Sequence, residues 1–168
     1  MNAPVFEVSG AQVTRLEDYR LLTGGGKFAA DWNLPGQLYG HFLRSDVAHG
    51  HIVSLDVSAA KAHPGVHAVL TGEDAVRADC VQPVSFFNFA GKNGAKPLMP
   101  QWPVLAHERV RFVGEPVAFV VADTADVAQD ACGLIEVQYE VLPCAVDGDA
   151  ALAPGAPVLH ANIPGNQS

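Results

Sequence analysis

The residue types in this chain that could carry chemistry are histidines, cysteines, a few acidic groups and a lysine after a glycine-rich stretch. That stretch, Gly24–Lys27, suggests a phosphate-binding loop. Such a loop has the spacing G-x-x-x-x-G-K-[ST] and follows an apolar strand. Here the spacing is different, no apolar strand comes before it, and Phe28 stands where the hydroxyl residue should be. We therefore interpret the stretch as a turn.

The histidines offer two pairings that could bind a metal. His63 and His67 are four residues apart, but Pro64-Gly65 breaks any helix between them, so they cannot form the helical zinc pair. A second group could share a strand face: His49, His51 and His41. Without a further ligand at matching spacing, these histidines are interpreted as ordinary polar strand residues. We predict no metal ligand.

Three acidic groups could act as a general base. Glu17-Asp18 lies in an N-terminal arm, and Glu73-Asp74 lies in the expected first turn of a helix, where carboxylates stabilise the helix dipole. Glu115 lies in a tight bend, Gly114–Pro116, directly before a buried strand. We interpret Glu115 as a turn residue that accepts backbone hydrogen bonds, and we expect a positive φ at Gly114.

Lys92 in Gly91–Gly94 resembles the exposed lysine of a biotinyl or lipoyl carrier domain. Such a lysine needs a tight hairpin tip between matched strands. The aromatic residues before it and the prolines after it do not fit that pattern, so a solvated loop lysine is preferred. A stand-alone binding or carrier-type module remains the alternative function.

The cysteines, Cys80, Cys132 and Cys144, have no C-x-x-C spacing. This arrangement indicates reduced thiols, with Cys132 as a small core residue, and it excludes an iron–sulfur centre held by this chain. No Ser/His/Asp or Cys/His arrangement and no cofactor fingerprint is present. We therefore assign no catalytic, cofactor-binding or metal-binding residue from the sequence.

Composition limits the function classes. The chain has 168 residues, 49% hydrophobic and 17% charged, with a net charge of −8. These values predict one packed domain. The acidic balance and the absence of a Lys/Arg cluster argue against nucleic acid or an anionic membrane as partner. No apolar run approaches the roughly 20 residues that span a bilayer, and no signal peptide is evident. A cytoplasmic protein is expected.

The elements that position these residues are clearest near the C-terminal end. Val117–Ala122 is a continuous apolar run, which is typical of a strand covered on both faces. Asp123-Thr124, with Asp126 following, indicates a helix start. Residues 135–141 alternate apolar and polar as a strand does. We predict a right-handed βαβ unit at about 117–141, in a single α+β domain.

Earlier segments give weaker patterns. Residues 1–22 are expected to form an extended arm, and residues 148–168 a linker. Four strands and two helices are also expected: the strands at 27–32, 38–44, 51–57 and 66–70, and the helices at 59–62 and from Thr71. Residues 79–103 have no periodic pattern.

These segments also resemble a known family, the xanthine dehydrogenase/aldehyde oxidase family, and specifically the α/β hammerhead domain that opens its molybdopterin-binding subunit. The resemblance runs in the family's order over nearly the whole chain: Arg15–Gly24, Leu34–Leu38, Phe42–Ser45 with His49 and Ile52, Asp56–Ala60, Pro64–Val66, Ala68–Gly72, Val110–Thr124, Ile135–Pro143 and Gly165-Asn166. Asp46 departs from the pattern, because a proline is expected after Arg44-Ser45. The resemblance implies a hammerhead domain at residues 23–147.

The resemblance implies an oxidoreductase with molybdopterin and molybdenum in the complete subunit, and with 2Fe-2S and FAD on partner subunits or domains. Its cofactor segments and catalytic glutamate are expected downstream of the hammerhead, so this chain alone is expected to be inactive and to bind no cofactor. Its expected partners are the remaining cofactor-binding part of the molybdenum subunit and the iron–sulfur and FAD components. Sequence alone does not give the substrate.

The irregular segment 79–103 is rich in large apolar side chains: Phe86, Phe87, Phe89, Met99 and Trp102. They are too many for a solvated loop of this length. In the resembled enzymes the hammerhead packs against its own subunit. We therefore predict that this segment is a docking surface or a lip of the substrate channel, and that it is exposed or mobile in the isolated chain.

Overall fold

The computed structural model describes residues 15–80, 94, 98–100 and 102–167. The chain divides into two units, Met1–Gln37 and Leu38–Ser168. No helix in the described part of the chain is both long enough and apolar enough to cross a membrane.

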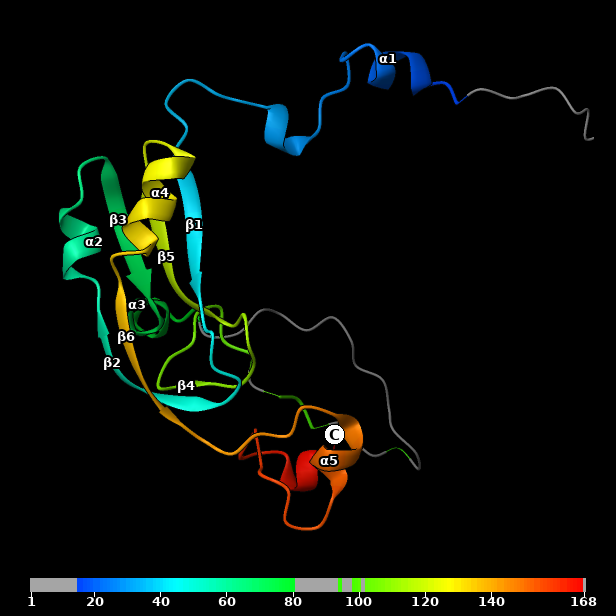
Figure 1. Cartoon of the computed structure of the whole chain (residues 1–168), viewed down its shortest axis with the longest axis vertical. Coiled ribbons are helices and arrows are strands. Elements are labelled where there is room, and N and C mark those ends of the chain that lie inside the picture. The colour runs from blue at the N-terminus through cyan, green and yellow to red at the C-terminus, as the bar shows by residue number, and fades with distance from the viewer. Residues whose placement is uncertain (1–14, 81–93, 95–97, 101, 168) are drawn as a thin grey trace, which may run out of the picture. The chain divides into compact units, whose positions relative to one another are not determined.

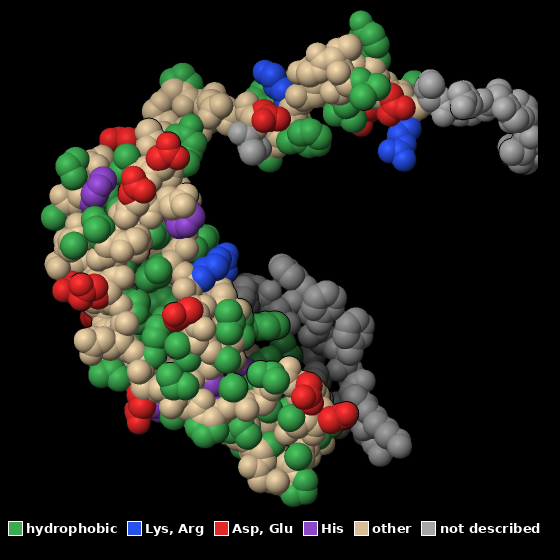
Figure 2. All heavy atoms as spheres, viewed as in Figure 1, with side chains coloured by type: hydrophobic (Ala, Val, Ile, Leu, Met, Phe, Trp, Pro, Cys, Tyr) green, Lys and Arg blue, Asp and Glu red, His purple; other side chains and the backbone are tan. Residues whose placement is uncertain are grey.

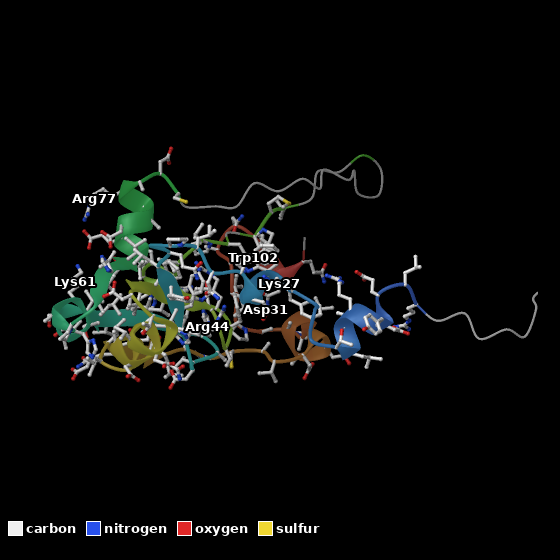
Figure 3. All side chains as sticks on the ribbon, turned by 90° about the horizontal axis from the view of Figure 1, so that it is seen from above. Lys27, Asp31, Arg44, Lys61, Arg77 and Trp102 are labelled. Carbon is white, nitrogen blue, oxygen red and sulfur yellow. The ribbon has the colours of Figure 1, made fainter. Side chains whose placement is uncertain are left out.

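The first unit contains two short helical segments. Helix α1 spans Asp18–Leu22 and buries none of its residues, while the 3₁₀ helix η1 spans Ala29–Asp31. The expectation of an extended arm is therefore corrected at α1. The expected strand at 27–32 is also wrong, because the carboxylate of Asp31 accepts the backbone N–H of Phe28 and closes a turn there. Lys27 lies over the ring of Trp32 at 5.0 Å from its centroid (Figure 3).

The first sheet of the second unit has the order β1-β5-β3 and is antiparallel throughout. Its strands are β1 (Tyr39–Arg44), β5 (Pro116–Ala122) and β3 (Val66–Thr71). Figure 1 shows helix α4 (Ala125–Cys132) beside this sheet, and α4 contacts all three strands. Three alternate residues of β5 enter the core under α4: Ala118, Val120 and Ala122. On the other face, Val117 is buried in a second core cluster, whereas Phe119 and Val121 are half-buried, so the prediction that both faces are covered is confirmed only at the start of this strand.

The second sheet has the order β4-β2-β6 and is also antiparallel. Its strands are β4 (Arg109–Val110), β2 (Gly50–Asp56) and β6 (Glu136–Val141). The strand–helix–strand order at 117–141 is confirmed, but the βαβ unit is not, because β5 and β6 belong to different sheets. The single-face alternation of β6 is typical of an antiparallel sheet strand, whereas a parallel unit would bury both strands on both faces.

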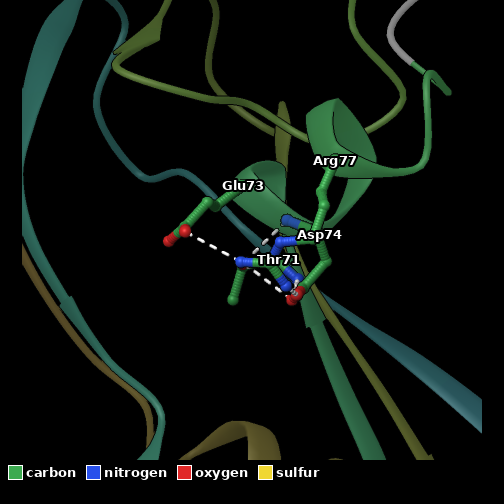
Figure 4. A network of polar contacts seen from close by, with 4 residues as sticks. All are labelled: Thr71, Glu73, Asp74 and Arg77. Carbon is green, nitrogen blue, oxygen red and sulfur yellow. Dashed lines mark hydrogen bonds and ion pairs between the residues drawn. The ribbon is translucent and has the colours of Figure 1, made fainter.

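Side-chain caps fix where the helices begin. Thr71 caps α3 (Gly72–Arg77) through a reciprocal pair of hydrogen bonds (Figure 4). The Thr71 hydroxyl accepts the backbone N–H of Asp74, and the Asp74 carboxylate accepts the backbone N–H of Thr71. Thr124 caps α4 by accepting the N–H of Val127 at 3.2 Å. The Asp123 carboxylate is not the cap, because it binds the His67 ring instead. The short helix α2 (Ser58–Ala62) lies close to its expected bounds.

The C-terminal segment is more ordered than the expected linker. It contains helix α5 (Gly148–Leu152) and the 3₁₀ helix η3 (Pro164–Asn166). The Asn166 side chain donates to the carbonyls of Ala151 and Pro157, which closes the segment on itself. Ile163 is buried, so this tail has a small apolar contact of its own.

Candidate functional site

The bend before β5 is fixed to the loop after β1. Gly114 has φ +91°, which confirms the expected positive φ. Its N–H donates to the Ser45 carbonyl at 2.7 Å, and the N–H of Ser45 donates to the Glu115 carbonyl at 2.9 Å. The Arg44 guanidinium donates to the Gly114 carbonyl at 2.8 Å. The bend is therefore a non-helical turn, and a reciprocal pair of backbone hydrogen bonds joins it to Ser45, about 70 positions earlier in the chain.

Glu115 is the most deeply buried charged residue of this bend, with 1% of its surface exposed. One carboxylate oxygen accepts the backbone N–H of Arg111, which confirms the predicted role in accepting backbone bonds. Burial raises the pKa of Glu115, while the Arg111 backbone bond and charge oppose the rise. The other oxygen, Oε1, has no partner among the described residues. The buried Glu115 carboxylate therefore stabilises the turn through one oxygen, while Oε1 remains an unsatisfied acceptor.

Further polar side chains join this group in pairs: Tyr139 interacts electrostatically with Glu115, His160 with Arg111, and His49 with His160. His49 is 4% exposed, and its Nδ1 donates to the Pro143 carbonyl at 2.7 Å, which leaves Nε2 as a buried acceptor without a partner in the described chain. Burial lowers the pKa of His160, and the charges of Arg111 and His49 lower it further. Burial also raises the pKa of Tyr139. A polar cluster of this kind needs ordered water to satisfy its open acceptors.

The sequence singled out two members of this cluster, Glu115 and His49, but missed Arg111, Tyr139 and His160. Only the bend motif gave a local signal for it. The Glu115 side chain is buried and does not line either of the cavities described below. We therefore assign the cluster to the stability of the domain.

The larger cavity, about 470 Å³, lies between β2 and the start of α3. Two of its three acids are already used by the helix: Arg77 pairs with Glu73 at 2.9 Å and with Asp74 at 3.1 Å (Figure 4). The third acid, Glu108, lies 3.8 Å from the His107 ring. The backbone N–H and the hydroxyl of Thr71 hold the pKa of Asp74 below its ordinary value. The carboxylates of Glu73 and Asp74 stabilise the first turn of α3, as the sequence predicted, and are poor general bases.

The remaining histidines have separate partners. The His63 ring binds the adjacent Pro64 carbonyl, and the His67 ring binds Asp123 at 2.7 Å. His51 interacts with Arg109 rather than with His49. Within the described ranges, no group of three His, Cys, Asp or Glu side chains is placed to hold a metal ion.

The other sequence candidates also lie apart. Gly24 has φ +74° in the turn after α1, as the turn interpretation requires. Cys132 is a buried core residue, and Cys80 and Cys144 are exposed free thiols, which agrees with the prediction of reduced cysteines. Lys92 lies outside the described residues, as do Phe86, Phe87 and Phe89.

The described residues do not fit a molybdopterin site. The larger cavity is lined by strand residues and by charges that are mostly paired with one another.

The class defined by this architecture is a small α+β domain with two three-stranded antiparallel sheets. Residues 23–143 match the family described as "Aldehyde oxidase and xanthine dehydrogenase, a/b hammerhead domain". The chain therefore belongs to this family of molybdopterin oxidoreductases, as the resemblance indicated.

Individual relatives agree. The carbon monoxide dehydrogenase large chain of Afipia carboxidovorans is 43% identical over 154 residues, 92% of this chain and 18% of the relative. The nicotine 6-hydroxylase large subunit of Paenarthrobacter nicotinovorans is 40% identical over 159 residues, 95% of this chain and 19% of the relative. A crystal structure of a Cu,Mo-CO dehydrogenase aligns with a TM-score of 0.75 and 43% identity, covering 92% of this chain and 18% of that one. The chain thus spans less than a fifth of these relatives.

Proposed function

We propose that this chain is the hammerhead part of a molybdenum hydroxylase and acts by packing against the cofactor-binding part of the large subunit, without catalytic residues of its own. The observation that carries the proposal is the family match over residues 23–143. Molybdopterin with molybdenum would then be bound by the rest of the subunit. Iron–sulfur and FAD components are the proposed electron-transfer partners.

Exposed apolar side chains support a packing role. Large hydrophobic groups are exposed just before β4 and in the bend before β5: Leu98, Met99, Trp102, Val104, Phe112 and Val113. Trp102 has 59% of its surface exposed and Val113 has 64%. Single exposed apolar groups are ordinary, but several within 16 residues of chain suggest a surface that a partner covers. Figure 2 shows hydrophobic side chains among the acidic groups on the face drawn.

This surface includes the described end of the segment predicted to dock, residues 79–103. Trp102 and Met99 are exposed, in keeping with that prediction, while its three phenylalanines lie outside the described residues. The proposed occupant of the surface is the cofactor-binding part of the same large subunit, because this chain covers less than a fifth of the large chains that it resembles.

The proposal is tested by affinity purification of the tagged chain from its native host. The partner is identified by its molybdenum and pterin content, and the intact mass of the chain is measured in the same sample. We expect a molybdenum-containing complex that Trp102→Ala weakens, with Lys61→Ala on α2 as a matched surface control (Figure 3). A chain that purifies without molybdenum, or that carries a lipoyl or biotinyl adduct on Lys92, would reject the packing role.

A further inference from the structure

A second, smaller cavity of about 260 Å³ lies beside β4 and concentrates basic groups. Its wall includes two arginines and two histidines, Arg109, Arg111, His51 and His107. These residues come from β4, the residues beside it and the start of β2, while Asn162 of the C-terminal tail completes the rim. In a chain with a net charge of −8, this is an unusual gathering of positive charge.

The backbone around the cavity is held in place without any ligand. His51 pairs with Arg109 in the β2–β4 register. The N–H of Ile52 donates to the Glu108 carbonyl at 2.8 Å, and the N–H of Arg109 donates to the His107 carbonyl at 2.7 Å. The tail is tied down where the Asn162 amide donates to the Met99 carbonyl at 2.8 Å. The guanidinium groups therefore project from a fixed frame.

The two guanidinium groups are incompletely satisfied. Arg109 donates to the His51 ring at 3.2 Å, and Arg111 donates through Nε to the Leu159 carbonyl at 3.3 Å. Among the described residues, neither forms an ion pair with a carboxylate, unlike Arg20 and Arg77. An arginine has five N–H donors, so both retain several for another acceptor.

The only acid on the cavity wall does not neutralise this charge. The Glu108 side chain is 83% exposed, and its carboxylate lies 3.8 Å from the His107 ring. Burial lowers the pKa of Arg111, the charge of Glu115 opposes that effect, and the charge of Arg109 lowers the pKa further. Two like charges at one half-buried site favour a bound anion.

We propose that this cavity binds a small oxyanion, a carboxylate or phosphate group, held between Arg109 and Arg111. The planar guanidinium matches the two oxygens of such a group and can bind them in a bidentate manner. The volume is below the roughly 300–1,000 Å³ typical of pockets for whole small molecules, so a single anionic group fits better than a complete ligand. The proposal is independent of the packing role, because it needs only the chain's own residues.

The two sources of such an anion are an acidic side chain of another protein segment and a free or cofactor-borne phosphate. Nitrogen-detected NMR of the arginine side chains distinguishes them, with acetate and inorganic phosphate titrated separately at constant ionic strength in sodium chloride. We expect saturable shifts of the Arg109 and Arg111 Nε signals. Tighter binding of acetate assigns the site to a carboxylate, and tighter binding of phosphate assigns it to a phosphate group.

Variants show whether the signal comes from the cavity. Arg109→Gln and Arg111→Gln should each weaken binding at least tenfold, and Arg111→Lys should weaken it as well because lysine lacks the planar fork. Arg77→Gln on α3 is the matched control and should bind as the wild type does. If Arg111→Gln fails to fold, Arg109→Gln and the wild-type titration still show whether the anion binds in this cavity. Unsaturable shifts, equal shifts in chloride alone, or equal loss in Arg77→Gln would overturn the proposal.

Discussion

Valine at position 114 should destabilise the chain through backbone strain alone. Gly114 has φ +91°, and a Cβ added there would meet no atom within 4 Å, so no clash contributes. A left-handed conformation costs a residue with a Cβ about 1–2 kcal/mol, and β-branching places valine at the upper end. We expect Gly114→Val to lower the free energy of unfolding by about 2 kcal/mol, which corresponds to about 4–8 °C in Tm for a chain of this size.

Urea unfolding followed by circular dichroism measures this loss, and two variants isolate its cause. Gly114→Asn should lose less, because asparagine tolerates positive φ. Gly148→Ala is the control: that glycine also has open space around its Cβ position but no positive φ, and alanine there should stabilise by about 0.4–1 kcal/mol. A Gly114→Val variant within about 0.5 kcal/mol of the wild type would refute the strain argument.

Three further outcomes are expected. Burial raises the pKa of the Glu115 carboxyl group above 4.5, so the folded state binds the carboxyl proton more tightly than the unfolded state does. The free energy of unfolding should therefore fall as the pH rises from 4.5 through the raised pKa. Urea unfolding at a series of pH values measures this fall, which should be absent in Glu115→Gln. Thr71→Ala should lower the free energy of unfolding by about 1 kcal/mol, because the α3 cap is lost. Thr23→Ala, in the residue after α1, is the control and should lower it less. Equal losses in the two variants would contradict the capping argument. Metal analysis of the purified chain should find no molybdenum. A near-stoichiometric molybdenum content would contradict the prediction that this chain alone binds no cofactor.

Most of the longer strands could be predicted because their signals are local, whereas the expected strand at 27–32 was wrong and the two-residue strand β4 was missed. The apolar run of β5 and the two-residue period of β6 depend only on neighbouring residues, and both lie close to the predicted bounds. The pairing of the strands is non-local, and there the sequence misled: two strands flanking a helix suggested one parallel unit, but each joins a different antiparallel sheet. The alternation of β6 was the available sign of this.

The polar cluster shows the same limit at the level of side chains. The Gly114–Pro116 motif predicted a bend and a Glu115 carboxylate that accepts backbone hydrogen bonds. The His49 ring, however, binds the carbonyl of Pro143, 94 positions away, and Arg111 binds the carbonyl of Leu159, 48 positions away. Contacts at such separations follow from the pairing of β2 with β6 and from the packing of the C-terminal segment beside β4, and they leave no spacing pattern in the sequence.

The central claim is that this domain packs against the cofactor-binding part of a large subunit through its exposed apolar surface. Hydroxyl-radical footprinting of Trp102, compared between the purified chain and the assembled enzyme, tests it most directly. Trp102 is 59% exposed here, so it should react readily in the chain alone. Trp102 should be strongly protected in the assembly, while Leu152 on α5, used as an internal reference, should keep its reactivity. Equal oxidation of Trp102 in both samples would contradict it.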